Sequence, residues 1–345
     1  MNVHRIPPIY ARSRSVFLQN NPYRYRQNDK NIVSLYNRKF TIWSNQEGLS
    51  NFSWKTALLI FFGIPFTVYL YKCTMLVLFQ NKLIYMPFLP FGTRKLTLEE
   101  MRIDKRLECK QVTVETPDKC KLAGIIVKAR NVDNKITDVL FDDLEPIIIY
   151  FQGNAGNMLF RIPIFTKLLL YSTNIVKNLQ IVAIGYRGYW FSTGSPSEKG
   201  LKIDALAIYE SVRALYPKNP IYIYGHSLGG AVALYLASNE KIQKDLKGII
   251  IENAFTSIKD MVTTIYPQKW LPYKYLVNIP FLNRNKWDNY HMIQGIKIPI
   301  LFLSSRNDEI VPQEQMIELH KKAKMSKKKQ LKFLSMNQYQ ITTIN

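Results

Sequence analysis

The chain reads Ile221-Tyr-Ile-Tyr-Gly-His-Ser-Leu-Gly-Gly-Ala-Val-Ala-Leu-Tyr-Leu-Ala237, an apolar run that passes through a G-x-S-x-G turn into helix-forming residues. This pattern predicts a strand, a sharp turn and a helix. Such a turn lifts the Ser clear of the backbone and needs neighbours without bulk, which Gly225 and Gly229 provide. The helix after Ser227 points its first amides and its positive dipole end at the place where an ester or thioester under attack gains negative charge. Ser227 is therefore a candidate nucleophile; the alternative is a coincidental turn, because the motif alone is weakly specific.

Short apolar runs separated by helical segments surround this motif. Such runs are typical of a buried parallel sheet, and the carboxyl ends of its strands form the working face. An antiparallel hairpin, 110–115 with 122–127, is expected at the leading edge of the sheet. The sequence thus predicts an α/β fold, a mostly parallel sheet with helices on both faces. The expected strands are 147–151, 180–185, 221–224, 248–251 and 298–303, and the expected helices include 157–171, 198–216 and 230–239.

One of these strand ends continues as Phe151-Gln-Gly-Asn-Ala-Gly-Asn157. Its two glycines allow backbone N–H groups to approach a ligand closely. The amide of Asn154, with that of Leu228, is therefore expected to form an oxyanion hole. The alternative is a plain turn between a strand and a helix, which the neighbouring G-x-S-x-G turn disfavours.

The composition narrows the class of protein. The chain has 345 residues and a net charge of +22. Its hydrophobic content of 47% excludes general disorder. Its positive residues gather in the N-terminal tail and one late Lys run without a recognition motif, so an anionic membrane surface fits them better than nucleic acid. The three cysteines, Cys73, Cys109 and Cys120, have no metal-ligand spacing and indicate neither a disulfide framework nor a metal site.

The first 106 residues are divided into a basic tail over 1–53, a transmembrane anchor over 54–79 and a linker over 80–106. A span needs about 20 apolar residues, so Lys72 must snorkel or mark the membrane interface. The alternatives are a transit peptide for the tail and a buried amphipathic helix for the span. The positive-inside tendency predicts a single-pass protein with a cytoplasmic tail.

The remaining residues, 107–345, form the expected catalytic domain. The stretch 131–145 is charged and is expected to be a surface loop. Residues 255–295 are rich in aromatics and prolines, and are expected to cover the working face as a small cap that suits a fatty acyl chain. The Lys-rich run 321–329 predicts a solvated turn or, alternatively, a contact with anionic lipid headgroups.

Several motifs follow one another along the chain: Gln152-Gly-Asn-Ala-Gly-Asn157, Tyr186-Arg-Gly-Tyr189, Ser195-Pro-Ser-Glu-Lys-Gly200, Gly225-His-Ser-Leu-Gly-Gly230, Glu252-Asn-Ala-Phe-Thr-Ser257 and Asp308-Glu-Ile-Val-Pro312. In order and spacing this set resembles the membrane-anchored ABHD-type α/β-hydrolases, a family of serine hydrolases. The resemblance implies an α/β-hydrolase fold with Ser227 as nucleophile and Asp308 as the acid that orients a histidine. It also implies hydrolysis of acyl esters or thioesters, in lipids or S-acylated proteins, through an acyl-enzyme and without a cofactor.

The chain departs from this family in three places. Gln152 replaces a usual histidine, and Gly185 replaces a usual aspartate before Tyr-Arg-Gly. The third departure is the most consequential, because no histidine follows His320, whereas the family places its catalytic histidine after the last strand. Either this sequence is a truncated version of a longer protein, or it is a hydrolase-like scaffold or lipid-binding protein that has lost its base.

Four histidines remain as substitutes. His4 lies in the tail, and His226 is expected to shape the site rather than to act as a base, because the elbow directs adjacent side chains apart. His320 is expected to be solvated on a helix that leads away from Asp308. His291 is expected at a helix end or in a solvated loop, and is a weak candidate for the catalytic base.

Overall fold

The computed structural model describes residues 53–130, 145–173, 175–176, 178–268, 272–306, 308–334 and 341–344. The predicted basic tail and most of the predicted loop at 131–145 lie outside the described residues. The chain divides into two compact units between Pro65 and Phe66. The second unit holds the sheet and its covering helices, while the helix from Trp54 to Ile84 begins in the first.

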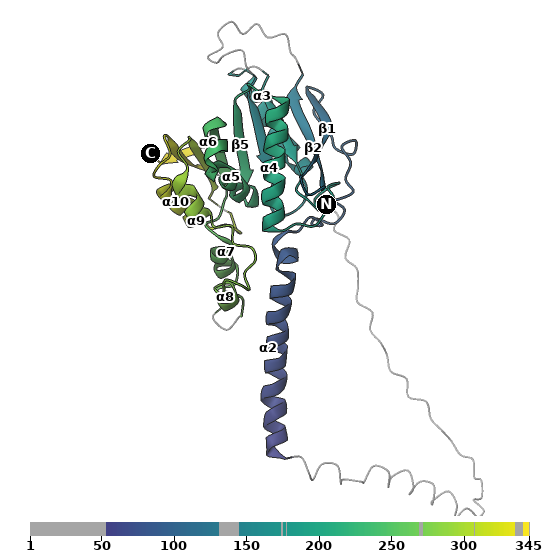
Figure 1. Cartoon of the computed structure of the whole chain (residues 1–345), viewed down its shortest axis with the longest axis vertical. Coiled ribbons are helices and arrows are strands. Elements are labelled where there is room, and N and C mark those ends of the chain that lie inside the picture. The colour runs from purple at the N-terminus through teal and green to yellow at the C-terminus, as the bar shows by residue number, and fades with distance from the viewer. Residues whose placement is uncertain are drawn as a thin grey trace, which may run out of the picture. The chain divides into compact units, whose positions relative to one another are not determined.

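A single mixed sheet organises the second unit (Figure 1). Among the described residues it has nine strands in the order β1-β2-β4-β3-β5-β6-β7-β8-β9. The pairs from β4 through β8 are parallel, whereas β1, β2 and β4 pair antiparallel, as do β8 and β9. The expected hairpin at the leading edge is thus confirmed, while β9 was not predicted. The strands are β1 (Leu107–Glu115), β2 (Lys121–Ala129), β3 (Ile147–Phe151), β4 (Gln180–Ile184), β5 (Ile221–His226), β6 (Leu246–Glu252), β7 (Ile300–Ser305), β8 (Lys329–Leu334) and β9 (Ile341–Ile344).

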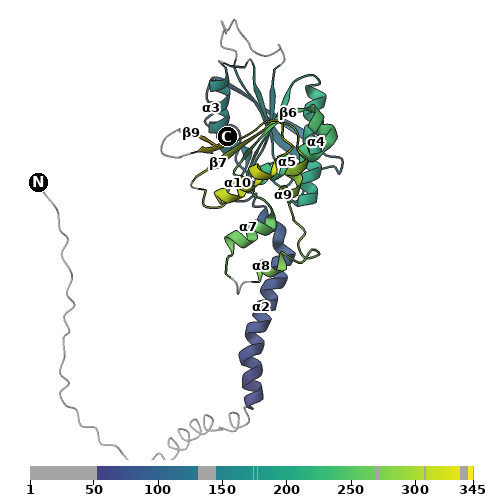
Figure 2. The ribbon, with the colours of Figure 1, turned by 90° about the vertical axis from the view of Figure 1, so that its left-hand side faces the viewer.

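Helices cover both faces of the sheet, as the sequence predicts, and Figure 2 shows α3 and α4 on opposite sides. One apolar cluster packs α4 and α5 against the sheet through Leu201, Ile208 and Ala231. The other packs α3 against the opposite face through Phe165 and Leu169. The helices are η2 (Met158–Arg161), α3 (Ile162–Ser172), α4 (Glu198–Leu215), α5 (Leu228–Ser238), α6 (Glu240–Asp245), α7 (Ile258–Ile265), α8 (Tyr273–Leu276), α9 (Asn289–Met292), η3 (Ile293–Gly295) and α10 (Gln313–Lys322).

Helix α2 (Trp54–Ile84) contains the predicted anchor but extends past its expected end at residue 79. No residue of α2 is buried, so the alternative of a buried amphipathic helix does not describe it. Its length and apolar composition suffice for a membrane span. The helix is distorted at Phe79. Next to this point, the side chain of Gln80 is held by the domain: its Nε2 donates to the Leu282 carbonyl at 3.0 Å and its Oε1 accepts from the Arg284 amide at 2.8 Å.

The segment after α2 packs on the domain rather than acting as a free linker. Tyr85 is buried, and its hydroxyl donates to Asn285 Oδ1 at 2.7 Å while accepting from Trp287 Nε1 at 2.9 Å. Asn285 Nδ2 in turn donates to Asn81 Oδ1 at 2.7 Å. This buried polar network joins the end of α2 to the cap, and we call residues 84–93 the collar.

A buried ion pair stabilises the turn after β4. Arg187 bonds to Asp204 on α4 and to Asp118 on the β1–β2 turn, at 2.8 Å in each case. The Asp204 side chain is fully buried, whereas that of Asp118 is 41% exposed. The Arg187 amide also donates to Asp204 at 2.8 Å. Asp204 therefore compensates most of the charge that Arg187 carries into the protein.

We expect Asp204→Ala to lower the free energy of unfolding by about 3 kcal/mol or more, because it leaves a buried guanidinium without its inner partner. Asp118→Ala, the matched control, should cost about 1 kcal/mol or less, because water replaces its carboxylate. Chemical unfolding of the detergent-solubilised chain measures both. Equal losses in the two variants would show that the buried pair has no special weight.

Candidate active site

Ser227 stands at the carboxyl end of β5 with a strained backbone. Its φ of 53° and ψ of −115° are unusual for a residue with a side chain. The Ser227 amide donates to the Glu252 carbonyl at 2.8 Å, which fixes the turn to the end of β6. Helix α5 begins at once with Leu228, two residues earlier than predicted. The geometry is that of the predicted strand, turn and helix.

Glycines at 225 and 229 allow the chain to close on itself at this turn. A Cβ atom at Gly225 would lie 2.1 Å from the Gly229 carbonyl oxygen, and one at Gly229 would lie 2.0 Å from the Phe151 carbonyl oxygen. These are distances that real carbon atoms do not adopt, so α5 can begin against β3 only because both side chains are absent. The close approach brings Leu228 beside the turn that follows β3.

That turn holds the second predicted oxyanion donor. Within the described residues, the amides of Asn154 and Leu228 donate to no acceptor. The Asn154 carbonyl, by contrast, is fixed from two sides: it accepts from the Met86 amide at 2.8 Å and from the Tyr189 hydroxyl at 2.8 Å. The Asn154 side chain also donates to the Ile84 carbonyl at 3.2 Å. The turn is thus held rigidly while the Asn154 amide stays available to a ligand. An oxyanion hole requires both features.

Sequence reasoning missed these anchors. Tyr189 belongs to the Tyr186-Arg-Gly-Tyr189 motif, whose first residue donates its hydroxyl to the Gln152 carbonyl at 3.0 Å. Both tyrosines are buried. Two aromatic hydroxyl groups that directly follow a buried strand were the available signal, because buried hydroxyl groups need partners. Met86 and Ile84 gave no such signal, because a backbone contact from a distant segment leaves no pattern in the sequence.

Asp308 lies beyond the end of β7, and it accepts hydrogen bonds from within its own loop. Its Oδ1 accepts from the Ile310 and Val311 amides, at 2.9 Å each. No histidine among the described residues hydrogen-bonds to Asp308 or to Ser227. The structure therefore describes the turn that carries Ser227 and the loop that carries Asp308, but its described residues bring no imidazole between them.

His226 is the histidine beside the turn, and its ring shapes the site as predicted. A Cβ atom at Gly153 would lie 3.1 Å from His226 Nδ1, so the ring packs against the oxyanion turn. Burial lowers the pKa of His226 to about 4, although the carboxylate of Glu252 opposes the shift. Glu252 accepts from the Tyr224 hydroxyl at 2.9 Å and faces Arg161 at 3.5 Å. His226 is accordingly a neutral ring at physiological pH.

The other two described histidines lie apart from this arrangement. The prediction of a solvated His320 was wrong, because its ring packs edge-on against Phe302 at 5.2 Å between centroids and burial lowers its pKa. His291 is 73% exposed on α9, as predicted, and its Nδ1 lies 2.6 Å from Asp288 Oδ2. As the weak candidate for the catalytic base, His291 would need contact with Ser227, which no hydrogen bond provides within the described residues.

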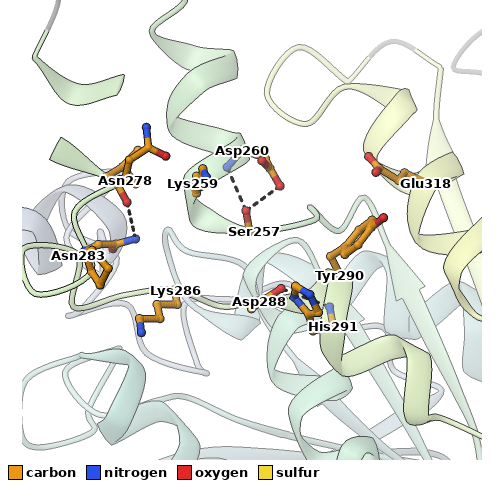
Figure 3. Close-up of a pocket in the computed structure, with 12 residues that line it drawn as sticks. Ser257, Lys259, Asp260, Asn278, Asn283, Lys286, Asp288, Tyr290, His291 and Glu318 are labelled. Carbon is orange, nitrogen blue, oxygen red and sulfur yellow. Dashed lines mark hydrogen bonds and ion pairs between the residues drawn. The ribbon is translucent and has the colours of Figure 1, made fainter. Parts of the chain in front are cut away.

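Figure 3 shows the pocket of about 500 Å³ to which His291 belongs. Its wall includes Ser257, Asp260 and Lys286 from the cap and Glu318 from α10, and it includes neither Ser227 nor Asp308. Ser257 donates to Asp260 at 2.7 Å rather than to His291. The pocket is therefore separate from the Ser227 turn. The part of the chain that the structure describes has no cluster of three His, Cys, Asp or Glu side chains fit to hold a metal ion.

Comparison with known proteins matches this chain to a hydrolase family model and to several related proteins. Residues 183–290 match the family model Hydrolase_4, described as serine aminopeptidase, S33. Protein bem46 of Schizosaccharomyces pombe is 35% identical over 73% of this chain and 77% of its own length. The uncharacterized membrane protein YNL320W of Saccharomyces cerevisiae is 30% identical over 74% and 81%. The lysophosphatidylserine lipase ABHD12 of Danio rerio is 29% identical over 59% of this chain and 54% of its own length.

We expect Gly229→Ala to abolish the Ser227 turn, because the added methyl must push α5 away from β3. The free energy of unfolding should fall by about 3 kcal/mol or more. Gly295→Ala is the matched control, since a Cβ there meets no atom within 4 Å, and its effect should stay within about 0.5 kcal/mol. Thermal unfolding in detergent measures both. A Gly229→Ala protein as stable as the control would contradict the close packing.

The buried His226 predicts a loss of stability in acid. The unfolded chain binds a proton near pH 6.5, whereas the folded chain keeps His226 neutral down to about pH 4. Stability from this group is therefore full above pH 6.5 and falls as the pH drops through this window, by on the order of 3 kcal/mol. His226→Gln should flatten the slope, and His291→Gln should not. Identical slopes in wild type and His226→Gln would disprove the burial argument.

Proposed function

Because the chain belongs to the α/β-hydrolase family of protein bem46, we propose that it is a membrane-anchored serine hydrolase that cleaves acyl esters of lipids, with Ser227 as its nucleophile. The observation that carries the proposal is the strained turn at Ser227 beside two amides that donate to no acceptor among the described residues. Backbone strain of this kind costs about 1–3 kcal/mol and persists where function uses it. ABHD12, a relative that acts on lysophosphatidylserine by its name, favours lipid esters over the thioesters of S-acylated proteins.

In the proposed reaction, Ser227 Oγ attacks the ester carbonyl. The Asn154 and Leu228 amides donate to the oxyanion as it forms, and because the collar already fixes the turn, they need no rearrangement at that moment. The alcohol then leaves, and water hydrolyses the acyl-enzyme. Asp308 serves as the acid of the site. The base that accepts the serine proton is not one that the described residues place beside Ser227.

The anchor belongs to the same proposal. Helix α2 spans the membrane once, and the basic tail 1–53 lies on the cytoplasmic side with the catalytic domain opposite. The membrane relative YNL320W, with 81% of its length matched, supports the assignment of a membrane protein.

One observation favours a second candidate function. Asp308 binds its own loop amides, and no described histidine bonds to it or to Ser227. Losing one member of a catalytic triad lowers turnover by several orders of magnitude, while the oxyanion hole remains. The second candidate is therefore a lipid-binding protein or membrane scaffold that holds acyl ligands at the same turn without efficient turnover.

We expect a fluorophosphonate probe to label the wild-type chain in membranes and to leave Ser227→Ala unlabelled, because only an activated serine reacts with such a probe. Ser257→Ala is the matched control and should label normally, since Ser257 bonds to Asp260 in the separate pocket. His291→Ala should also label normally. Labelling is read by gel fluorescence and located by mass spectrometry.

A folded wild-type chain that resists the probe would favour the lipid-binding function over the hydrolase. Loss of labelling in His291→Ala, with the fold intact, would instead identify His291 as the base and would contradict its placement away from Ser227.

A further inference from the structure

We propose that the cap segment Tyr273–Leu282 rests in the interface of the membrane leaflet that α2 enters, so that a lipid substrate reaches Ser227 sideways from that leaflet. The position of the cap is inferred from the structure alone. Only the route of the substrate rests on the proposed hydrolase function.

The exposure of α2 locates the membrane boundary. From Trp54 to Lys72 nearly every side chain of α2 is exposed, whereas Cys73, Met75, Leu76 and Val77 are partly covered. The uncovered part is about 19 residues, or roughly 28 Å of helix, close to the thickness of about 30 Å of a bilayer hydrocarbon core. Lys72 therefore lies at the boundary, with its ammonium group among the headgroups.

The cap reaches this level along α2. Arg284 donates to the Val77 and Leu78 carbonyls, at 2.7 Å and 3.0 Å, at the base of the cap. The Leu282 carbonyl, at the end of the cap segment, also accepts from Gln80 Nε2 of α2 at 3.0 Å. Figures 1 and 2 both show α8 beside α2. Because Val77 follows Lys72 by about one and a half turns, the base of the cap lies close to the boundary, and α8 lies beside the part of α2 that leads to it.

The exposed side chains of the cap suit that depth. Tyr275 is 53% exposed and Phe281 is 81% exposed. Large apolar groups gathered on one surface usually mark a site of protein or membrane contact. Tyrosine is enriched at the headgroup level because its ring is apolar and its hydroxyl is polar. The cap segment is bonded to α2 through the Leu282 carbonyl, so the bilayer that receives the apolar surface of α2 is the occupant that fits the cap as well.

The same geometry gives a short path to the nucleophile. Ile84 ends α2, and its carbonyl accepts from the side chain of Asn154 in the oxyanion turn. Phe88 and Phe91 of the collar are also exposed, at 45% and 89%. An acyl chain that leaves the leaflet along the cap and the collar thus arrives at the edge of the sheet that carries Ser227.

The depth of the cap can be measured with single cysteines that carry an environment-sensitive dye. Cys73, Cys109 and Cys120 are first replaced by alanine, and Tyr275→Cys and Phe281→Cys are then labelled in the full chain in vesicles of phosphatidylcholine and phosphatidylserine. Leu215→Cys, 61% exposed at the end of α4, is the matched control on the amino-terminal edge of the sheet. We expect blue-shifted emission and quenching by nitroxide-labelled lipid at 275 and 281 but not at 215.

Two results would overturn the proposal. Emission as in water at both cap positions, without quenching by lipid, would place the cap outside the membrane. Dyes shielded from both aqueous iodide and lipid nitroxide would mean that protein, such as a second copy of the chain, covers the patch.

The route of the substrate is tested by Phe281→Asp, with Leu215→Asp as control. We expect Phe281→Asp to reduce hydrolysis of a lysophospholipid in vesicles about tenfold, because a charge in the interface opposes insertion, and to leave hydrolysis of a soluble short-chain ester within about twofold. Equal loss on both substrates would disprove the sideways route. If neither substrate is hydrolysed by the wild type, the hydrolase function fails, whereas the dye result still decides the position of the cap.

Discussion

The backbone of Ser227 is held in a left-handed conformation, at φ 53°, and the remainder of the site depends on that constraint. A residue with a side chain adopts it only when its surroundings leave no alternative. Here β5 and β6 hold the Ser227 amide through the Glu252 carbonyl, and α5 closes over Gly225 and Gly229 against β3. The strain lifts the side chain above the sheet and leaves the amide of Leu228 free. The proposed nucleophile and one of the two proposed oxyanion donors therefore follow from a single turn.

The second oxyanion donor depends on a part of the chain that is remote in sequence. The turn at Asn154 is held by Met86 and Ile84, at the end of α2, and by Tyr189 after β4. The same end of α2 is tied to the cap through Tyr85 and Asn285. Helix α2 is thus part of the framework around the Asn154 turn as well as a candidate membrane span, so a shift of the collar would move that turn and the cap together. This shared support explains why an apolar helix and a catalytic turn occur so close to each other.

Local patterns predicted the elements whose structure is decided locally. The apolar run of β3, the Gly225-to-Gly229 turn and the leading hairpin all lie where the sequence places them, because strand periodicity and glycine requirements act within a few residues. The predictions that were wrong or missing concern side chains whose surroundings are set by partners far away in the sequence. His320 was expected to be solvated, yet its ring packs on Phe302 of β7. The link from Tyr85 to Asn285 joins residues 200 positions apart, and no local pattern encodes such a pair. Whether Ser227, Asp308 and the two amides act together stays a prediction.

Two requirements of a serine hydrolase are separable in this chain. Stabilising an oxyanion needs only fixed amides, which the backbone of Asn154 and Leu228 supplies without any side chain. Activating the serine needs an imidazole in reach, and the described residues place none between Ser227 and Asp308, whose Oδ1 accepts from the amides of Ile310 and Val311. His226, although adjacent in sequence, is turned into the oxyanion turn and kept neutral by burial. The fold can therefore retain the strained turn whether or not turnover is fast, because the packing that maintains the strain comes from glycines and strand ends and does not depend on a base.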